Sequence, residues 1–415
     1  MKTLYAGSFD PLTLGHMDVV NKALKAFGSV LIVIADSPAK KYMFTAIERK
    51  AMVDKIYVGN ENVKCEILPK NVYVASYANS LGIKHIVRGL RNATDLLNEQ
   101  DLYEGNKKIA NDIESVFFMP SKGVEHVSSS AVKSFIGYDG FTFLLDEMVH
   151  RVVGNEMVKK WIDVIFKDKF GQDYFSPYKD ACDSNLFSFY DIGKRHYHNL
   201  YHIAYVLLKF WKLIEKINPA LVGNKISPLF YGQAFFAILW HDLVVEFTDD
   251  DEKNSIKLIN EKTNNIIYFS RVCGDFLEEQ NSTLMEEMIL STSFKWIGPK
   301  YGFQTNLEMR KMFCKAIRMA DWMVFTESPK NYEKYAIDIK REIMDCRKDL
   351  SELDVLSNRV NFLEKIDLNQ FIDFSLLSEE HKCNAFNNIK WEINKLEMDL
   401  ARLSWEKKIS EIKHI

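Results

Sequence analysis

Short apolar runs alternate with helical patterns through about the first 140 residues of the chain. A strand is expected at each apolar run, namely Lys2–Ala6, Val30–Ala35, Val63–Ile67, His85–Val87 and Ser115–Met119. Helical spacing of apolar residues is found between these runs, at Gly15–Phe27, Ala46–Val58, Val74–Leu81 and Asp95–Ile109. Strands that alternate with helices in this way build βαβ units, whose strands are parallel. The pattern therefore predicts an α/β domain around a parallel sheet.

The pattern changes after about residue 150, where strand signals fade and long helical patterns follow. Helices are expected at Tyr201–Ile217, Tyr231–Val245, Asp251–Asn264, Leu307–Phe325, Tyr332–Lys348 and Glu380–Ile415. The last two are rich in Lys, Glu and Leu, and we interpret the C-terminal one as a solvated helix face, with an oligomer contact as the alternative. We predict an α/β domain over residues 1–145 and an all-α domain over residues 155–415, joined around Gly137–Gly154.

The composition excludes several classes of protein. The 415 residues fit two or three domains, and a net charge of −3 gives no electrostatic reason to expect nucleic acid as a partner. The six cysteines stand singly, with no CxxC pair, which suits a reducing compartment. The first residues interrupt any signal-peptide core, and no apolar run reaches membrane-spanning length. We expect a cytoplasmic protein with no membrane partner.

Residues suited to phosphate follow the first predicted strand. Gly7 lets the backbone approach a ligand closely, and Ser8 offers a hydroxyl. The helix that starts near Gly15 presents free N–H groups and the positive end of its dipole. His16, in the first turn of that helix, can donate a hydrogen bond to a phosphate oxygen as charge develops on it.

Further cations and hydroxyls follow the other predicted strands. Lys40 follows the second strand, while Arg88 and Arg91 follow the fourth. Ser128–Ser130 follow the last strand and lead into a helix that carries Lys133. Open parallel sheets bind ligands beyond the carboxyl ends of their strands. These side chains are therefore expected to converge on one phosphate-binding site.

The segments GSFDPLTLGH, SPAKKYMFT, VRGLRNATDLLNEQ, SVFFMPSK and VSSSAVK resemble, in this order, bacterial phosphopantetheine adenylyltransferase, a family of the T/HxGH nucleotidyltransferase superfamily. The resemblance covers about residues 1–150. It implies a Rossmann-like nucleotidyltransferase domain that joins AMP from ATP to 4′-phosphopantetheine and releases pyrophosphate. It also implies Mg²⁺ bound with ATP, and a homo-oligomer.

The resemblance assigns roles to the matched positions. The catalytic group is expected to be His16, Lys40, Arg88 and Ser8. The ATP-binding residues would be Gly7, Ser8, His16, Arg91, Glu99, Ser128, Ser129 and Ser130. The acceptor would be bound by Ser8, Lys40, Val74, Arg88 and Asn106.

Three departures concern the acceptor side of this pattern. The stretch Val72–Ala78 replaces a Leu/Met-rich segment ahead of an aromatic–Ala pair, Val124 replaces an aromatic residue, and Leu97-Asn98 replaces an aromatic–acidic pair. Nicotinamide mononucleotide adenylyltransferase is a relative with the same reaction core. Nicotinamide mononucleotide is therefore the alternative acceptor.

A second group of polar residues lies in the helical part. His196, His198 and His202 fall in one short window, and His241-Asp242 ends a long apolar helix. Asp321 adds a carboxylate within another apolar helix, where a lone buried acid needs a partner or a metal ion. Imidazole and carboxylate ligands together suit manganese, zinc, iron or magnesium.

This H…HD…D order resembles the HD superfamily of metal-dependent phosphohydrolases over about residues 155–400. The resemblance implies a divalent metal held by His202, His241, Asp242 and Asp321, and hydrolysis of a phosphate ester or nucleotide. If nicotinamide mononucleotide is the acceptor of the first domain, this domain is expected to act on a related nucleotide. The resemblance also places Arg195, His198 and Glu252 around the substrate phosphate or behind the ligands. Lys295 stands where the small relatives carry a further histidine, so a non-catalytic binding or assembly module is the alternative to a hydrolase.

Overall fold

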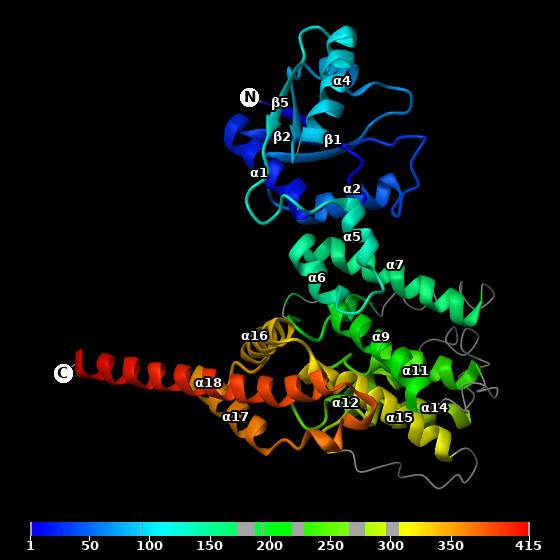
Figure 1. The fold of residues 1–415 in the computed structure, drawn as a ribbon, viewed down its shortest axis with the longest axis vertical. Helices are drawn as coiled ribbons and strands as arrows, with labels where there is room; N and C mark the ends of the chain where they lie inside the picture. Colours follow the sequence, from blue (N-terminus) through cyan, green and yellow to red (C-terminus); the bar gives the residue numbers. More distant parts are fainter. Residues whose placement is uncertain are drawn as a thin grey trace. The chain divides into compact units, whose positions relative to one another are not determined.

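The computed structural model describes residues 2–91, 93–171, 187–191, 193, 195–217, 228–264, 279–295 and 307–413. The chain divides into two compact units, Met1–Met157 and Val158–Ile415. Figure 1 shows a sheet with helices in the first unit and helices throughout the described part of the second. Each unit is described by itself below.

The first unit is built on a five-stranded parallel sheet, as the sequence predicts. Its strands are β1 (Lys2–Gly7), β2 (Ser29–Ile34), β3 (Val63–Ile67), β4 (His85–Gly89) and β5 (Glu114–Phe118). They lie side by side in the order β3-β2-β1-β4-β5, and every pair is parallel. The chain order reverses between β1 and β4, and the ligand crevice of an open α/β sheet lies at such a point.

Helices connect the strands of this sheet. They are α1 (Leu14–Phe27), α2 (Ala46–Ile56), α3 (Val74–Ser80) and α4 (Ala93–Ile109). Each lies within about two residues of its predicted limits. Residues Val30–Ile34 of β2 are all buried, because a parallel sheet is covered by its crossover helices on both faces.

The predicted join between the two domains is helical. After α5 (Ser129–Phe135), residues Gly137–Gly154 include α6 (Phe141–Met148) and the start of α7 (Arg151–Phe170). The first unit ends within α7, at Met157. The predicted domain limits, at residues 145 and 155, fall in α6 and α7 and stay predictions.

In the second unit, every described element is helical. The elements are η2 (Phe187–Asp191), α9 (Leu200–Ile217), α11 (Pro228–Trp240), α12 (Asp251–Asn264), α14 (Glu279–Leu290), α15 (Leu307–Trp322), η3 (Met323–Thr326), α16 (Pro329–Cys346), α17 (Glu352–Lys365), η4 (Leu368–Gln370), η5 (Phe374–Leu376) and α18 (Glu379–Lys413). Helices α9, α11 and α15 pack against one another around the buried rings of Phe210, Phe230 and Phe313. No helix among the described residues is long and apolar enough to cross a membrane.

Two expected helices end earlier than the sequence suggests. Helix α11 ends at Trp240. The following residues form a turn, so His241 and Asp242 are not spaced as residues of a helix. Helix α15 stops at Trp322 and continues as a 3₁₀ turn. Both endings lie beside candidate metal ligands, where the backbone turns.

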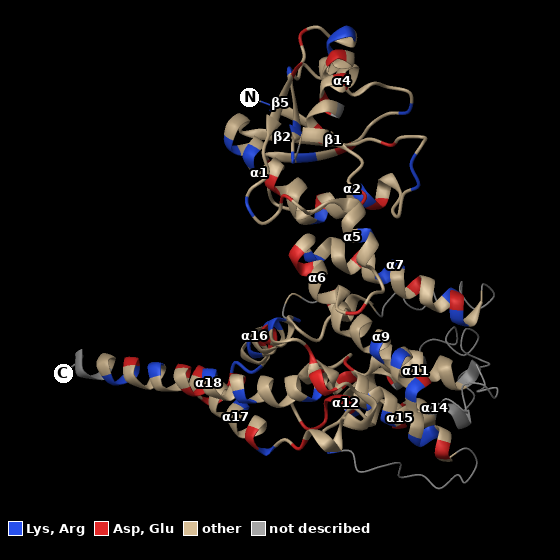
Figure 2. Ribbon diagram, viewed as in Figure 1, with Lys and Arg blue, Asp and Glu red and all other residues tan. Residues whose placement is uncertain are grey.

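The charged C-terminal helices are not simply solvated. Figure 2 shows both signs of charge along α18, yet Glu392 on this helix is buried. Its carboxylate accepts hydrogen bonds from Arg359 Nε (2.9 Å) and from the Tyr332 hydroxyl (2.5 Å). Glu342 on α16 is likewise buried. The interpretation of the C-terminal segment as a solvated helix face is therefore wrong at Glu392.

Removal of the Glu392 carboxylate should destabilise the second unit. Glu392→Ala leaves the buried Arg359 cation without its partner, which costs about 3 kcal/mol or more. All seven tryptophans of the chain lie in the second unit, so unfolding followed by tryptophan fluorescence reports on that unit. Glu406→Ala, which removes an exposed partner of Arg402, should change the midpoint little. Equal shifts of the unfolding midpoint in Glu392→Ala and Glu406→Ala would contradict this interpretation.

Candidate functional site

The start of α1 fixes the imidazole of His16. Thr13 is the N-cap, and its side chain accepts a hydrogen bond from the His16 backbone N–H at 3.4 Å. In return, the Thr13 backbone N–H donates to His16 Nδ1 at 3.0 Å. This reciprocal pair is a capping box with histidine in the place usually taken by Glu or Gln. Because Nδ1 accepts, the ring proton of the neutral imidazole lies on Nε2.

Electrostatics keep this imidazole neutral. Burial, together with the nearby cations of Arg91 and Arg88, lowers the pKa of His16 from 6.5 to about 4. At neutral pH the ring therefore offers Nε2–H as a donor without carrying a charge. The edge of the ring packs on Phe9, with the two ring centroids 5.1 Å apart.

Two glycines allow the turn after β1 to close around His16. A Cβ on Gly7 would lie 2.9 Å from the Phe9 ring, and Phe9 itself has a left-handed φ of 45°. A Cβ on Gly15 would lie 3.2 Å from the carbonyl oxygen of Val127. Gly7 therefore lets the turn fold back on Phe9, and Gly15 lets the first turn of α1 approach the segment before α5 closely.

Two buried charges hold the surrounding loops. The Asp10 carboxylate accepts hydrogen bonds from the backbone N–H groups of Met43 and Phe44, both at 2.9 Å, and from Lys133 at 2.8 Å. The Arg49 guanidinium donates to the carbonyl of Ser8 at 2.6 Å and to Phe44 at 3.1 Å. The turn after β1, the loop after β2 and helix α5 are thereby joined beneath the site.

Arginines and acids of β4 and α4 form two ion pairs beside His16. Arg88 binds Glu99 through two nitrogens, with Nε at 2.7 Å, and donates to the Ala6 carbonyl at 2.8 Å. Arg91 binds Asp95, also through two nitrogens. Burial of Asp95 opposes ionisation, but the hydrogen bonds from Arg91 hold its pKa below the usual value. Glu99, expected to bind ATP, is thus paired with Arg88.

One cavity of about 350 Å³ brings most of the predicted residues together. Its lining includes Gly7, Ser8, His16, Lys40, Arg88, Arg91, Glu99, Ser128, Ser129 and Ser130. Ser129 donates its hydroxyl to the Pro11 carbonyl at 2.8 Å, and Ser128 caps α5, so these two hydroxyls also hold the loop in place. Within the described lining of this cavity, neither Val74 nor Asn106 takes part. Their assignment to the acceptor stays a prediction.

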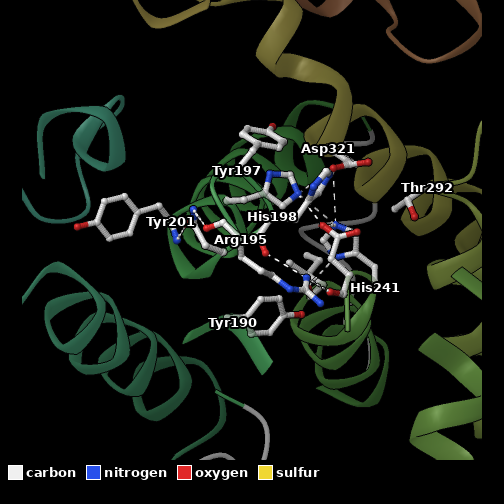
Figure 3. Close-up of polar contacts among 12 residues, drawn as sticks. Tyr190, Arg195, Tyr197, His198, Tyr201, His241, Thr292 and Asp321 are labelled. Atoms are coloured by element: carbon white, nitrogen blue, oxygen red, sulfur yellow. Dashed lines mark hydrogen bonds and ion pairs between the residues drawn. The ribbon is translucent and has the colours of Figure 1, made fainter. Parts of the chain in front are cut away.

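The second unit gathers its candidate metal ligands at one point. His202 Nε2 lies 3.1 Å from Asp242 Oδ2 and 3.1 Å from Asp321 Oδ1. His241 Nε2 lies 3.0 Å from Asp242 Oδ2 and 3.6 Å from Asp321 Oδ1, and the two imidazole nitrogens are 3.3 Å apart. Figure 3 shows the contacts of this cluster as dashed lines, with His241 and Asp321 labelled.

These distances suit a metal ion at His202, His241 and Asp242, whose ligand atoms all lie within 4.8 Å of one another, and Asp321 lies beside the two histidines. Nitrogen and oxygen ligands about 2.0–2.2 Å from a common ion lie about 3.0–3.5 Å from one another in octahedral or tetrahedral geometry. His241 Nδ1 lies 2.9 Å from the Ile238 carbonyl, which fixes the proton there and leaves Nε2 to face the cluster. Burial alone would lower the pKa of His241, but Asp242 and Asp321 raise it well above its usual value. The carboxylates thus favour a positive charge at this point.

The residues around the cluster have structural partners. Arg195 donates to the carbonyls of His198 (3.1 Å), Asp242 (2.5 Å) and Leu243 (2.7 Å), so its guanidinium joins the two histidine-bearing loops. Figure 3 shows Arg195 between His198 and the ring of Tyr190. The expected contact between Arg195 and a substrate phosphate stays a prediction.

His198 is held by Glu342. The Glu342 carboxylate lies 2.8 Å from His198 Nδ1 and accepts the His198 backbone N–H at 3.0 Å. Burial would lower the pKa of His198, but Glu342 and Asp242 raise it. His196 pairs in the same way with Asp345, at 2.9 Å.

Glu252 and Lys295 differ in their relation to the cluster. Glu252 lines a cavity together with Asp242 and Asp321, and burial together with these carboxylates raises its pKa to about 7. Lys295 pairs with Asp249 and, within the described lining, does not take part in that cavity. The residue that replaces the family histidine therefore faces solvent.

Most of the residues behind both sites are difficult to identify from the sequence. Asp10 stands in the quoted motif and Lys133 in the helix after Ser130, so their ion pair could have been proposed. Arg49 lies in a helix with no periodic signal for burial, and Glu342 lies in a segment that looks solvated. For these two, only the folded structure shows the partner.

The fold and the first cavity define a cytidylyltransferase-like nucleotidyltransferase domain, and a family model described as cytidylyltransferase-like matches residues 4–135. The phosphopantetheine adenylyltransferase of Streptococcus suis is 37% identical over 133 residues, which are 32% of this chain and 82% of that protein. The one from Natranaerobius thermophilus is 37% identical over 141 residues (34% and 86%), and that of Neisseria meningitidis serogroup C is 34% identical over 159 residues (38% and 91%). Through its N-terminal part, the chain belongs to the phosphopantetheine adenylyltransferase family.

One solved structure matches more of the chain. "Structure of LmjPDEB1 in complex with IBMX" aligns with 68% of this chain and 97% of its own, at 14% identity and a TM-score of 0.33. A similarity of this size carries no argument about the fold of the second unit.

The neutral state of His16 can be tested by titration. Because its pKa of about 4 lies below the ordinary 6.5, His16 should stay neutral as the pH falls from 7 to 5. The unfolded chain takes up this proton first, so the His16 contribution to stability is complete above pH 6.5 and is lost as the pH falls toward 4. NMR of the imidazole, assigned with His16→Asn, should show no titration above pH 5, and Arg91→Gln should raise the midpoint. A midpoint at 6.5 or higher would contradict the assignment.

Proposed function

We propose that the first unit transfers AMP from ATP to 4′-phosphopantetheine, giving dephospho-CoA and pyrophosphate. The observation that carries this proposal is the neutral His16, held by Thr13 in a cavity lined by Lys40, Arg88 and Arg91. The names of the relatives, which are phosphopantetheine adenylyltransferases, support the choice of acceptor.

The reaction is a direct displacement at phosphorus. An oxygen of the acceptor phosphate bonds to the α-phosphorus of ATP, and the bond from that phosphorus to the bridging oxygen breaks, so pyrophosphate leaves with the electron pair. His16 Nε2–H donates to a non-bridging α-phosphate oxygen, whose charge grows in the transition state. Lys40 and Arg91 balance the charges of the two substrates, and the backbone of the Gly7–Ser8 turn positions them.

Magnesium is proposed to enter with ATP. Both carboxylates that line this cavity, Asp95 and Glu99, are paired with arginines. The ion would therefore be held mainly by the triphosphate, whose charge it would reduce. Catalysis by the protein then rests on positioning and hydrogen bonding, with no covalent intermediate.

The acceptor can be decided in one experiment. We expect ATP and phosphopantetheine to give equal amounts of dephospho-CoA and pyrophosphate, whereas nicotinamide mononucleotide gives a much smaller kcat/KM. His16→Asn should lower kcat by about 100- to 1,000-fold, because a donor to the developing charge is lost. Lys50→Gln, on the exposed face of α2, is the matched control.

A faster reaction with nicotinamide mononucleotide would show that this compound, and not phosphopantetheine, is the acceptor. The altered Val72–Ala78 stretch is the reason to test it. Full activity in His16→Asn would remove the proposed role of the imidazole.

We further propose that the second unit binds a divalent metal ion through His202, His241, Asp242 and Asp321, and hydrolyses a phosphate ester there. The support is the set of distances of 3.0–3.6 Å among these ligand atoms. A bound ion would polarise a phosphate oxygen and make a bound water more acidic. Manganese, magnesium, iron and zinc all suit this mixed nitrogen and oxygen set.

Residues around the proposed ligands would orient the imidazoles and exchange a proton. Ile238 orients His241, Glu342 orients His198 beside the cluster, and Glu252, with its pKa of about 7, can exchange a proton near neutral pH. The surface position of Lys295 favours one ion over two, and it keeps a binding module without catalysis as the second candidate.

Metal content tests this second proposal. The purified protein should contain about one divalent ion per chain by mass spectrometry, and Asp242→Ala should lose it together with phosphatase activity toward p-nitrophenyl phosphate. Glu308→Ala, at the exposed partner of Lys311, should keep both. Metal retained without turnover would favour the binding module, and no metal in the wild-type protein would contradict the site.

A further inference from the structure

The C-terminal end of helix α18 (Glu379–Lys413) lies outside the packed part of the second unit. Figure 1 shows this end extending past α16 and α17, on which the rest of α18 packs. Every residue from Ser404 to Ser410 is exposed. Because helices in proteins draw most of their stability from the packing of an apolar face, the outer face of this segment is informative about a partner.

An apolar stripe runs along that outer face. It consists of Trp391, Met398, Trp405 and Ile409. The first three stand seven residues apart and the last follows one turn later, so all four share one side of the helix. Met398 is 74% exposed and Trp405 is 65% exposed, whereas Trp391 is partly covered by a ring of α16. The stripe spans about five turns and is most exposed at its centre.

A row of charges with alternating sign borders this stripe. It consists of Lys395, Asp399, Arg402 and Glu406, spaced three or four residues apart. Within the helix, Arg402 lies 3.4 Å from the Asp399 carboxylate and 3.5 Å from that of Glu406. Lys395 lies 3.2 Å from Glu333 of α16. Because each of these pairs reaches solvent, the same ions can also bind a neighbouring molecule.

The charged row is complementary to itself when it is read backwards. From Lys395 to Glu406 its signs are plus, minus, plus, minus, so an antiparallel copy presents minus, plus, minus, plus. With a two-fold axis beside Ala401, Asp399 lies opposite the partner's Arg402. A parallel copy would place the two rows on opposite sides of the contact, where they could not meet. The charges therefore favour an antiparallel copy of this helix.

The apolar residues match in the same register. The partner's Trp405 then lies within one turn of Met398, and the partner's Ile409 lies beside Trp391. Two-fold symmetry repeats both contacts. Tryptophan and methionine are typical of the buried centre of protein interfaces, whereas exposed ion pairs contribute little energy each. The stripe would thus supply the affinity, and the charged row would set the direction of pairing.

We propose that α18 binds the same helix of a second copy of this chain, antiparallel, with Met398 and Trp405 at the centre of the contact. The partner is a second copy because the charged row complements itself, whereas a partner with charge of one sign would be repelled by half of the row. This contact is independent of both proposed activities.

Disulfide trapping in the full-length protein tests the pairing. Lys395→Cys and Glu406→Cys, combined in one chain, should give a covalent dimer on oxidation, because each new thiol faces the other one in the partner. Neither substitution alone should do so, since equal positions of the two helices are about 16 Å apart and out of disulfide reach. A non-reducing gel measures the dimer, and the wild-type protein controls for the native cysteines.

Further substitutions in the double-cysteine protein test the two parts of the contact. Asp399→Arg and Arg402→Glu should each lower the yield of covalent dimer, and their combination should restore it, because the reversed charges are again complementary. Trp405→Glu should weaken pairing about tenfold or more, because it places a charge in the stripe. Ser404→Glu, one residue away on the exposed end but off the stripe, should leave the yield unchanged.

Three outcomes would overturn the proposal. The first is no covalent dimer from the double-cysteine protein, which would leave the stripe to a different partner. The second is a combined Asp399→Arg and Arg402→Glu variant that pairs no better than either single one, which would exclude the antiparallel register. The third is an equal yield in Trp405→Glu and Ser404→Glu, which would exclude the stripe as the contact surface. Circular dichroism checks that each variant keeps its helices.

Discussion

A charge that leaves water must be neutralised or hydrogen-bonded nearby, and this constraint shapes both units of the chain. In the first unit, the buried carboxylate of Asp10 accepts hydrogen bonds from the loop after β2 and from Lys133 of α5, and these bonds compensate for its burial. Arg49, almost fully buried, needs the carbonyl of Ser8 in the same way. These requirements close three loops around one point. The cavity at the β1–β4 switch point is the consequence, and His16 lies in it as a neutral donor because burial and the neighbouring arginines disfavour its protonation.

The second unit meets the same constraint differently. Glu342 and Glu392 find partners in His198 and Arg359, and these pairs fix the loops and helices around the cluster. At the cluster itself, His202 and His241 face the carboxylates of Asp242 and Asp321 with few other partners. A set of buried acids and imidazoles that converge on one point is stabilised best by a divalent cation. The proposed metal site and the framework that surrounds it therefore follow from one physical requirement.

The sequence predicted what depends on local pattern. Alternating strands and helices identified the parallel sheet, and the TLGH motif contains the capping box that orients His16. The H…HD…D order predicted the four residues whose side chains approach one another in the structure. The turn after Trp240 could not be predicted, because the apolar run before it suggests a longer helix. Long-range partners could not be predicted. Arg49 and Glu342 look like ordinary surface residues in sequence, because their partners are not their neighbours on the helix. Arg49 pairs with Asp36 and donates to the Ser8 carbonyl, and Glu342 pairs with His198.

The central claim is that one chain carries two chemically separate sites, each built around buried charge. The most direct test assays both reactions in His16→Asn and in Asp242→Ala. The account predicts that His16→Asn loses adenylyl transfer and keeps metal-dependent phosphate ester hydrolysis, while Asp242→Ala shows the reverse. Loss of both reactions in either variant, with the protein still folded, would contradict it.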